Sequence, residues 1–83
     1  MNPLAISKTD FAAMIEKPVS ITYDGEQVIG RIKQVYLAAN PPHEVGSFDF
    51  ELSPQDEIIF KKAGIPVPTN FSILDITDVT FLK

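Results

Sequence analysis

The sequence predicts an α+β domain built on a small, mostly antiparallel sheet. Three observations predict this class: short stretches in which apolar and polar residues alternate, a hairpin turn signal at Asp24-Gly25, and complete start and stop signals for one helix. The predicted order is α-β-β-β-α-β, in which four strands form an open sheet or open barrel and two short helices pack on one face or at one end. The 83 residues fit a single domain, residues 1–83, whose residues 1–6 are expected to be flexible.

The first helix is predicted to begin close to residue 7. Ser7 or Thr9 supplies an N-cap oxygen, and Asp10 suits the first turn. An apolar stripe at helical spacing follows, formed by Phe11, Met14 and Ile15. Pro18 ends this helix, because the residue before a proline avoids the α-helical conformation.

A β-hairpin follows the first helix. In residues 19–23, small hydroxyl-bearing side chains alternate with apolar and aromatic ones, which is the period of a half-buried strand. Asp24 and Gly25 both tolerate the positive φ of a type I′ turn. The second strand is therefore predicted over residues 26–37.

The register of the second strand changes along its length. The strand carries two apolar pairs of opposite parity, Val28 with Ile32 and Val35 with Leu37. A β-bulge near Lys33-Gln34 would bring both pairs to the core side. Alternatively, the strand bends at Gly30.

The third strand, residues 47–52, has the clearest alternation in the chain. Its apolar face carries Phe48, Phe50 and Leu52. The loop before it, residues 38–46, is expected to be stiffened by Pro41 and Pro42.

The second helix has the most complete end signals. Ser53 is the N-cap, Pro54 occupies the first helical position, and Asp56 stands where the carboxylate of a capping box belongs. Gly64 fits the left-handed position after the helix, and Pro66 prevents its continuation.

The last part of the chain is a connector followed by a strand region. Residues 65–70 are rich in proline and are expected to be irregular. Residues 71–82 are expected to form either one long strand or a strand that bends at Thr77-Asp78, since the apolar parity changes along them.

Composition restricts the classes of partner. Seven basic and eleven acidic residues give a net charge of −4, which argues against a nucleic-acid partner. The apolar stretches are a few residues long, against the roughly 20 that a membrane span needs, so no membrane partner is expected. The absence of cysteine and of a signal-peptide pattern favours a cytoplasmic location.

No catalytic, cofactor or metal site is predicted, and the chain is expected not to be an enzyme. The single histidine, His43, stands beside Glu44, but adjacent side chains usually point apart and no nucleophile motif accompanies them. No EF-hand pattern is present, and the four glycines are not spaced to cradle a phosphate. His43 is expected to be a solvated loop residue.

Two proline-containing segments are the main candidates for a binding surface. Each places apolar residues in an expected loop, where a rigid backbone presents them at low entropic cost; folding over the core is the alternative. A tyrosine at the end of the second strand is of a type enriched at interfaces, although packing at the core edge is its commoner use. The predicted partner-binding residues are Tyr36, His43, Val45, Ile65 and Val67.

An acidic patch is the second candidate surface. Two of its members alternate with the phenylalanines of the third strand and share its outer face, which is also what the solvated side of an antiparallel sheet looks like. The patch comprises Asp49, Glu51, Asp75 and Asp78.

A succession of short elements runs through residues 9–52: a helix with a phenylalanine, a hairpin, a Pro-containing loop and a Phe-rich strand. The residues concerned are Thr9-Asp10-Phe11, Ile15, Asp24-Gly25, Val35 and Ser47-Phe48-Asp49-Phe50-Glu51-Leu52. This succession resembles a group of small uncharacterised bacterial domains that tend to be encoded beside phage-tail-like collar proteins. The helix expected after residue 53 departs from that group, which continues as β structure, and the resemblance implies no functional residues.

The predicted sheet is also similar in architecture to phage head–tail joining proteins, which are small β-rich barrels. Residues 71–76 would correspond to their closing strand. Architecture of this kind does not by itself establish function.

These observations predict a non-enzymatic protein-interaction domain, phage-derived or accessory to a phage-like assembly. The alternative is a small acidic inhibitor or immunity-type protein that masks a basic surface on a target enzyme. An exposed edge strand could also pair two copies into a homo-oligomer.

Overall fold

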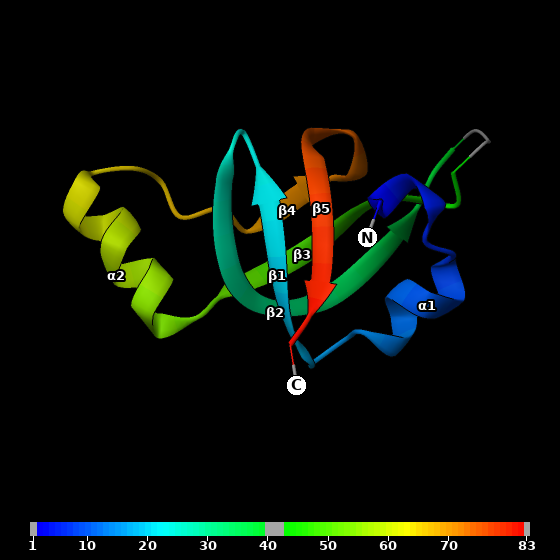
Figure 1. Cartoon of the computed structure of the whole chain (residues 1–83), viewed down its shortest axis with the longest axis horizontal. Coiled ribbons are helices and arrows are strands. Elements are labelled where there is room, and N and C mark those ends of the chain that lie inside the picture. The colour runs from blue at the N-terminus through cyan, green and yellow to red at the C-terminus, as the bar shows by residue number, and fades with distance from the viewer. Residues whose placement is uncertain (1, 40–42, 83) are drawn as a thin grey trace.

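The computed structural model describes residues 2–39 and 43–82 and has an α+β fold (Figure 1). Its elements, in chain order, are η1 (Pro3–Ala5), α1 (Lys8–Ala13), β1 (Pro18–Tyr23), β2 (Glu26–Leu37), β3 (Val45–Leu52), α2 (Pro54–Ala63), β4 (Asn70–Ser72), η2 (Ile73–Asp75) and β5 (Ile76–Phe81). The class, the antiparallel sheet and the two α-helices are confirmed. The predicted count of four strands is wrong, because the sheet has five.

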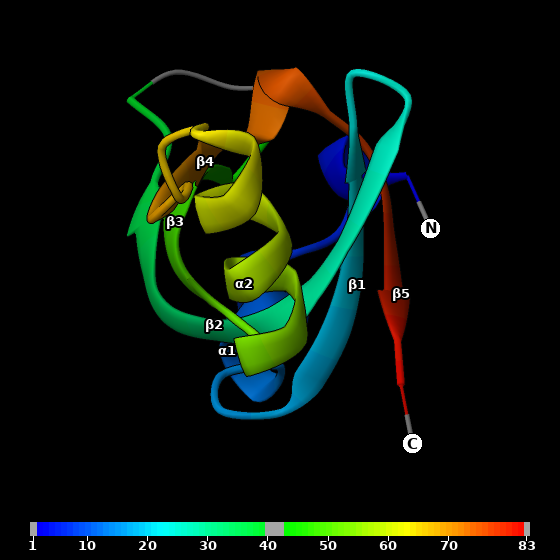
Figure 2. The same ribbon diagram turned by 90° about the vertical axis from the view of Figure 1, so that its left-hand side faces the viewer.

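The five strands form one open antiparallel sheet in the order β4-β3-β2-β1-β5. β2 is long and strongly curved, so that β3 and β4 pack on one side of the molecule and β1 and β5 on the other (Figure 2). α2 stands at one end of the molecule, and α1 lies toward the other end (Figure 1).

The hairpin and the bulge of β2 are confirmed. Asp24 and Gly25 have φ angles of 49° and 74°, as a type I′ turn requires. The pairing of β2 with β3 shifts between Ile32 and Gln34, where the bulge was predicted. Gly30 has a separate reason to be glycine, because a Cβ there would clash with the carbonyl oxygen of Glu51.

The bulge does not bury both apolar residues that follow it. Val35 is half-buried and packs against the core, but Leu37 remains 64% exposed. The expectation that both would reach the core is therefore wrong for Leu37, because β2 extends past the region that the core fills.

The C-terminal strand region breaks earlier than predicted. The chain forms η2 between β4 and β5, so it is not one continuous strand. A second irregularity lies where the bend was predicted, because the pairing of β5 with β1 skips Thr77. The Ser72 hydroxyl accepts a hydrogen bond from the Leu74 N–H at 3.4 Å, which stabilises the start of this turn. Ile73, the first residue of η2, and Ile76, the first residue of β5, are both buried. They are three positions apart, which a 3₁₀ turn places on one side.

Residues 2–6 contact the rest of the domain, and the flexibility expected of residues 1–6 stays a prediction. Asn2 caps η1, because its Oδ1 accepts the Leu4 N–H at 3.0 Å, and Pro3 and Ile6 are buried. Asn2-Pro3 is the same pairing of N-cap and first-turn proline that marks the second helix. A local start signal and one buried apolar residue, Ile6, thus position this segment.

An aromatic cluster fills the space between α1 and the curved sheet. Its ring centroids lie 4.9 to 6.2 Å apart, in tilted and edge-on geometries that aromatic pairs prefer. The cluster consists of Phe11, Tyr23, Phe48, Phe50 and Phe71. The three residues predicted on the α1 stripe reach this core, although the helix itself ends at Ala13, well before Pro18.

Candidate functional site

Helix α2 is fastened to the sheet at its first turn. The Ser53 Oγ accepts the Asp56 N–H at 3.4 Å, so the predicted N-cap is confirmed. The predicted capping-box role of Asp56 is not observed: its carboxylate accepts the Ile29 N–H at 2.7 Å, while the Ser53 N–H donates to the Ile29 carbonyl at 2.8 Å. The start of α2 therefore provides hydrogen-bond partners for both the N–H and the C=O of Ile29 in β2, next to the end of β3.

The C-terminal end of α2 is equally well defined. Gly64 has φ 71°, and the Ile65 N–H donates to the Phe60 carbonyl at 3.0 Å, which is the bonding of a Schellman motif. Phe60 is half-buried and is the side chain of α2 that packs against the core. Both predicted ends of the helix, Pro54 and Ala63, are confirmed.

The unusual feature of α2 is that none of its residues is buried. Ile58 and Ile59 are 52% and 62% exposed, and Ile65, directly after the helix, is 53% exposed. We refer to these three isoleucines as the α2 surface. Helices in proteins gain most of their stability by packing an apolar face, so a capped helix that leaves its isoleucines in water has apolar area available for another molecule.

The charges of α2 follow the helix axis. Asp56 and Glu57 lie in the first turn, and Lys61 and Lys62 in the last, which is the arrangement that the helix dipole favours. Glu57 and Lys61 form an ion pair of 2.9 Å. Helix α2 thus has an acidic first turn and a basic last turn on either side of Ile58 and Ile59.

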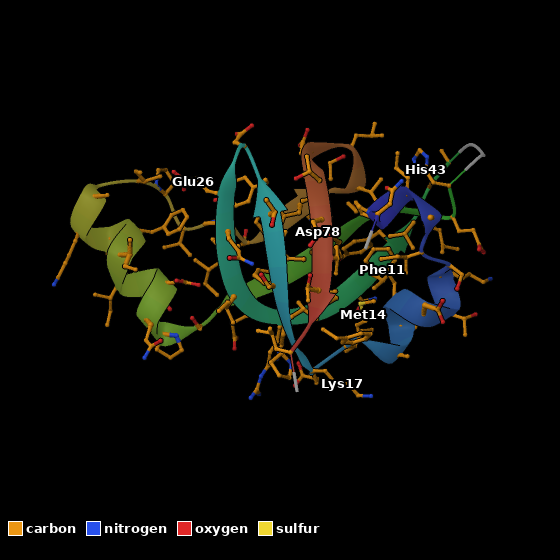
Figure 3. All side chains as sticks on the ribbon, viewed as in Figure 1. Phe11, Met14, Lys17, Glu26, His43 and Asp78 are labelled. Carbon is orange, nitrogen blue, oxygen red and sulfur yellow. The ribbon has the colours of Figure 1, made fainter. Side chains whose placement is uncertain are left out.

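The structure separates the predicted partner-binding residues. Ile65 is exposed beside α2, and Val67 in the same connector is half-buried against the core. The remaining three, Tyr36, His43 and Val45, belong to the end of β2, the following loop and the start of β3, and Figure 3 places His43 at the opposite end of the molecule from α2. Val45 is 1% exposed within β3, so the expectation of an apolar loop tip does not hold for it.

The loop containing His43 is described only in part. Asn40, Pro41 and Pro42 lie outside the described residues, so the predicted stiffening by the two prolines stays a prediction. His43 is half-exposed.

Tyr36 belongs to a hydrogen-bonded cluster on the outer face of the sheet. Its hydroxyl donates to Asp49 Oδ2 at 2.7 Å, and Asn70 Nδ2 donates to Asp49 Oδ1 at 3.1 Å. The hydrogen bond from Tyr36, followed by that from Asn70, lowers the pKa of Asp49, and the same bond raises the pKa of Tyr36. The Tyr36 and Asp49 side chains are hydrogen-bonded to each other, and together with Asn70 they link β2, β3 and β4.

The four residues of the predicted acidic patch do not share one strand or one neighbouring pair of strands. Asp49 and Glu51 lie on β3, Asp75 lies in η2, and Asp78 lies on β5, from which β3 is separated by β1 and β2. The Asp78 carboxylate accepts a hydrogen bond from the Thr80 hydroxyl at 2.8 Å.

Within residues 2–39 and 43–82, no group of three or more His, Asp or Glu side chains is placed to hold a metal ion. The same part of the chain contains no helix long and apolar enough to cross a bilayer.

Comparison with known proteins gives no match. Neither a family model, nor a curated protein, nor a solved structure matches this chain.

The sequence carried a signal for the α2 surface that the predicted contact set missed. Ile58, Ile59 and Phe60 are consecutive, and consecutive helical residues are separated by 100°, so the three side chains span about 200° of the helix. One helix face toward a core is narrower than that. The isoleucines therefore could not all be buried with Phe60.

Proposed function

We propose that this chain is a non-enzymatic protein-interaction domain that binds a protein partner through the α2 surface, Ile58, Ile59 and Ile65. The observation that carries the proposal is a helix with well-formed ends and a fixed attachment that nevertheless buries no residue of its own. Ile65 belongs to the predicted contact set, whereas the two helical isoleucines replace its residues at the far end of the molecule.

Several physical considerations support this surface. Burying an isoleucine side chain is worth about 1.5–3 kcal/mol, so a few such residues supply a useful share of a binding free energy. The helix is already ordered by its caps, so little conformational entropy is lost when a partner binds. An apolar helix face received by an apolar groove is a recurrent mode of recognition.

The charges of α2 indicate what a partner groove would look like. An apolar floor would receive the isoleucines, a basic group would face the end with Glu57, and an acidic group would face the end with Lys61 and Lys62. The resemblance of residues 9–52 to domains encoded beside phage-tail-like proteins favours a component of a phage-like assembly as that partner.

The acidic inhibitor or immunity-type protein remains the alternative. It has less support, because its four carboxylates are distributed over β3, η2 and β5, and because Asp49 and Asp78 accept hydrogen bonds from neighbouring side chains. Salt separates the two proposals, since a charge-based complex weakens as ionic strength rises and an apolar one changes little.

The test is a quantitative pull-down from host lysate at low and moderate salt, with captured proteins identified by mass spectrometry. Wild type is compared with Ile59→Glu and with a matched control, Leu74→Glu, which changes another exposed apolar residue, 69% exposed in η2. We expect a protein that survives moderate salt and is retained by the control but lost from Ile59→Glu. Equal retention by both variants, or loss of the protein from wild type with salt, would contradict the proposal.

A further inference from the structure

The second half of β2 has one unpaired edge. β1 pairs with β2 only as far as Arg31, opposite Pro18, and a single bridge from Ile15 to Ile32 follows. From residue 34 to residue 37, β2 pairs with β3 on one side, and Lys33 lies in the bulge just before these residues. In the described part of the chain, no strand pairs with the other side of residues 33–37. About five residues of strand, roughly 16 Å long, therefore have one open edge.

This open edge borders a mostly apolar groove. The groove lies between α1 and the end of β2, has a volume of about 380 Å³ and is open to solvent. It is lined by Lys8, Thr9, Ala12, Ile15, Gln34, Val35 and Leu37. Strand edges of this kind are usually shielded by charge, proline or a covering element, and here α1 stands beside the edge without filling the space.

Leu37 is the large apolar residue of the groove that is most exposed. It is paired with Val45, so both side chains project from the same face of the sheet. Val45 is 1% exposed in the core, yet Leu37 is 64% exposed. The core-facing side of β2 thus continues beyond the core that the described residues supply.

We propose that this β2 edge groove binds an extended segment of a partner protein by β-strand addition. The segment would pair its backbone with residues 33–37 of β2 and place apolar side chains at alternate positions against Val35 and Leu37. Lys8 is the charged residue among those that line the groove, so the segment would carry a carboxylate near that end.

The strand edge, the apolar lining and the charge of Lys8 each determine one property of the bound segment. The unpaired edge requires an extended backbone, because a helix offers no free N–H and C=O groups along its side. The lining residues require apolar side chains, and the charge of Lys8 favours an acidic one. The inference goes beyond the proposed function, since α1, which lines the groove, and α2 lie toward opposite ends of the molecule (Figure 1). The two surfaces can therefore be tested separately.

The test is an NMR titration of the isotope-labelled full chain with a synthetic hexapeptide. The peptide is acetylated and amidated, alternates valine with threonine, and ends in glutamate. We expect saturable shifts of the Val35 and Leu37 amides, with slower hydrogen exchange along the β2 edge. Two control peptides are N-methylated at every second amide, in opposite registers; one register should abolish binding, because it blocks the amides that face β2.

Three variants complete the test. Leu37→Glu should lose peptide binding, because it places a carboxylate on the apolar floor, whereas Leu74→Glu and Ile59→Glu should retain it. Absence of saturable shifts in the groove up to millimolar peptide would overturn the proposal, as would equal binding of both methylated peptides. Shifts at the edge that depend on protein concentration without peptide would also overturn it, in favour of a second copy as the occupant.

Discussion

The two α-helices of this chain are stabilised in different ways. α1 has six residues and buries Phe11 completely, with Met14 at its end buried as well. α2 has ten residues, a confirmed N-cap, a proline at its first position and a Schellman motif, and it buries no residue. The shorter helix is held by the core, whereas the longer one is held by its ends.

This difference separates two kinds of information in a sequence. Capping residues determine where a helix begins and ends, and apolar periodicity determines what it packs against. In α1 the two agree on one buried face. In α2 the caps are complete but the apolar residues are spread around the helix, so Phe60 packs against the core while Ile58 and Ile59 stay exposed.

The largest expected effect on the free energy of unfolding comes from a substitution in α1, the helix that packs into the core. Phe11→Ala removes a fully buried ring that contacts Phe48 at a centroid distance of 5.8 Å. The free energy of unfolding should fall by about 3–5 kcal/mol, measured by urea denaturation. A loss below 1 kcal/mol would show that α1 is no more tightly integrated than α2.

The attachment of α2 should give an intermediate effect. Asp56→Ala removes the acceptor of the Ile29 N–H, and the expected loss is about 1–2 kcal/mol. Faster hydrogen exchange of the Ile29 amide should accompany this loss. Asp56→Asn is the matched control, since its amide oxygen can still accept, and it should keep most of the protection; identical behaviour of the two variants would mean that this hydrogen bond does not hold the helix.

Substitution on the α2 surface should scarcely change stability. Ile59→Glu and its control Leu74→Glu both alter exposed side chains, so each should shift the free energy of unfolding by no more than about 0.5 kcal/mol. The same urea experiment that detects Phe11→Ala checks this. A loss comparable to that of Phe11→Ala would show that Ile59 packs within the domain, and it would remove the basis of the proposed interaction surface.

The smallest effect concerns the polar cluster on the outer face of the sheet. Tyr36→Phe removes the stronger of two hydrogen bonds that lower the pKa of Asp49, so that pKa should rise toward its ordinary value, as followed by NMR titration of the carboxyl group. A carboxylate with a lowered folded pKa contributes stability above its unfolded pKa and loses it as pH falls through the folded pKa. The variant should therefore have a weaker acid dependence of stability, and an unchanged Asp49 titration would contradict the hydrogen bond.

Much of the fold could be predicted because local signals and apolar periodicity agreed. Asp24-Gly25 specified the turn, the opposite parities within β2 specified its bulge, and Ser53 with Gly64 specified the ends of α2. The interruption of the last strand region by η2 could not be predicted in the same way. This turn depends on a single hydroxyl at Ser72 and on two buried isoleucines three positions apart.

The candidate surfaces were harder to predict, since exposure depends on where the core ends. Val45 looks like a loop residue in sequence but begins β3 inside the core, and Leu37 looks like a core residue but projects beyond it. Neither fact follows from local pattern, because both depend on how far β2 extends relative to its neighbours. Ile58 and Ile59 are different, since their consecutive positions beside Phe60 already implied exposure.

Hydrogen–deuterium exchange of the full chain, free and bound to the protein captured in the pull-down, would locate the partner surface directly. Protection on binding should be concentrated in α2 and the residue that follows it, with β3, which carries Asp49 and Glu51, unchanged. Protection of β3 and β5 with α2 unaffected would contradict the proposed α2 surface and would favour the acidic inhibitor or immunity-type protein.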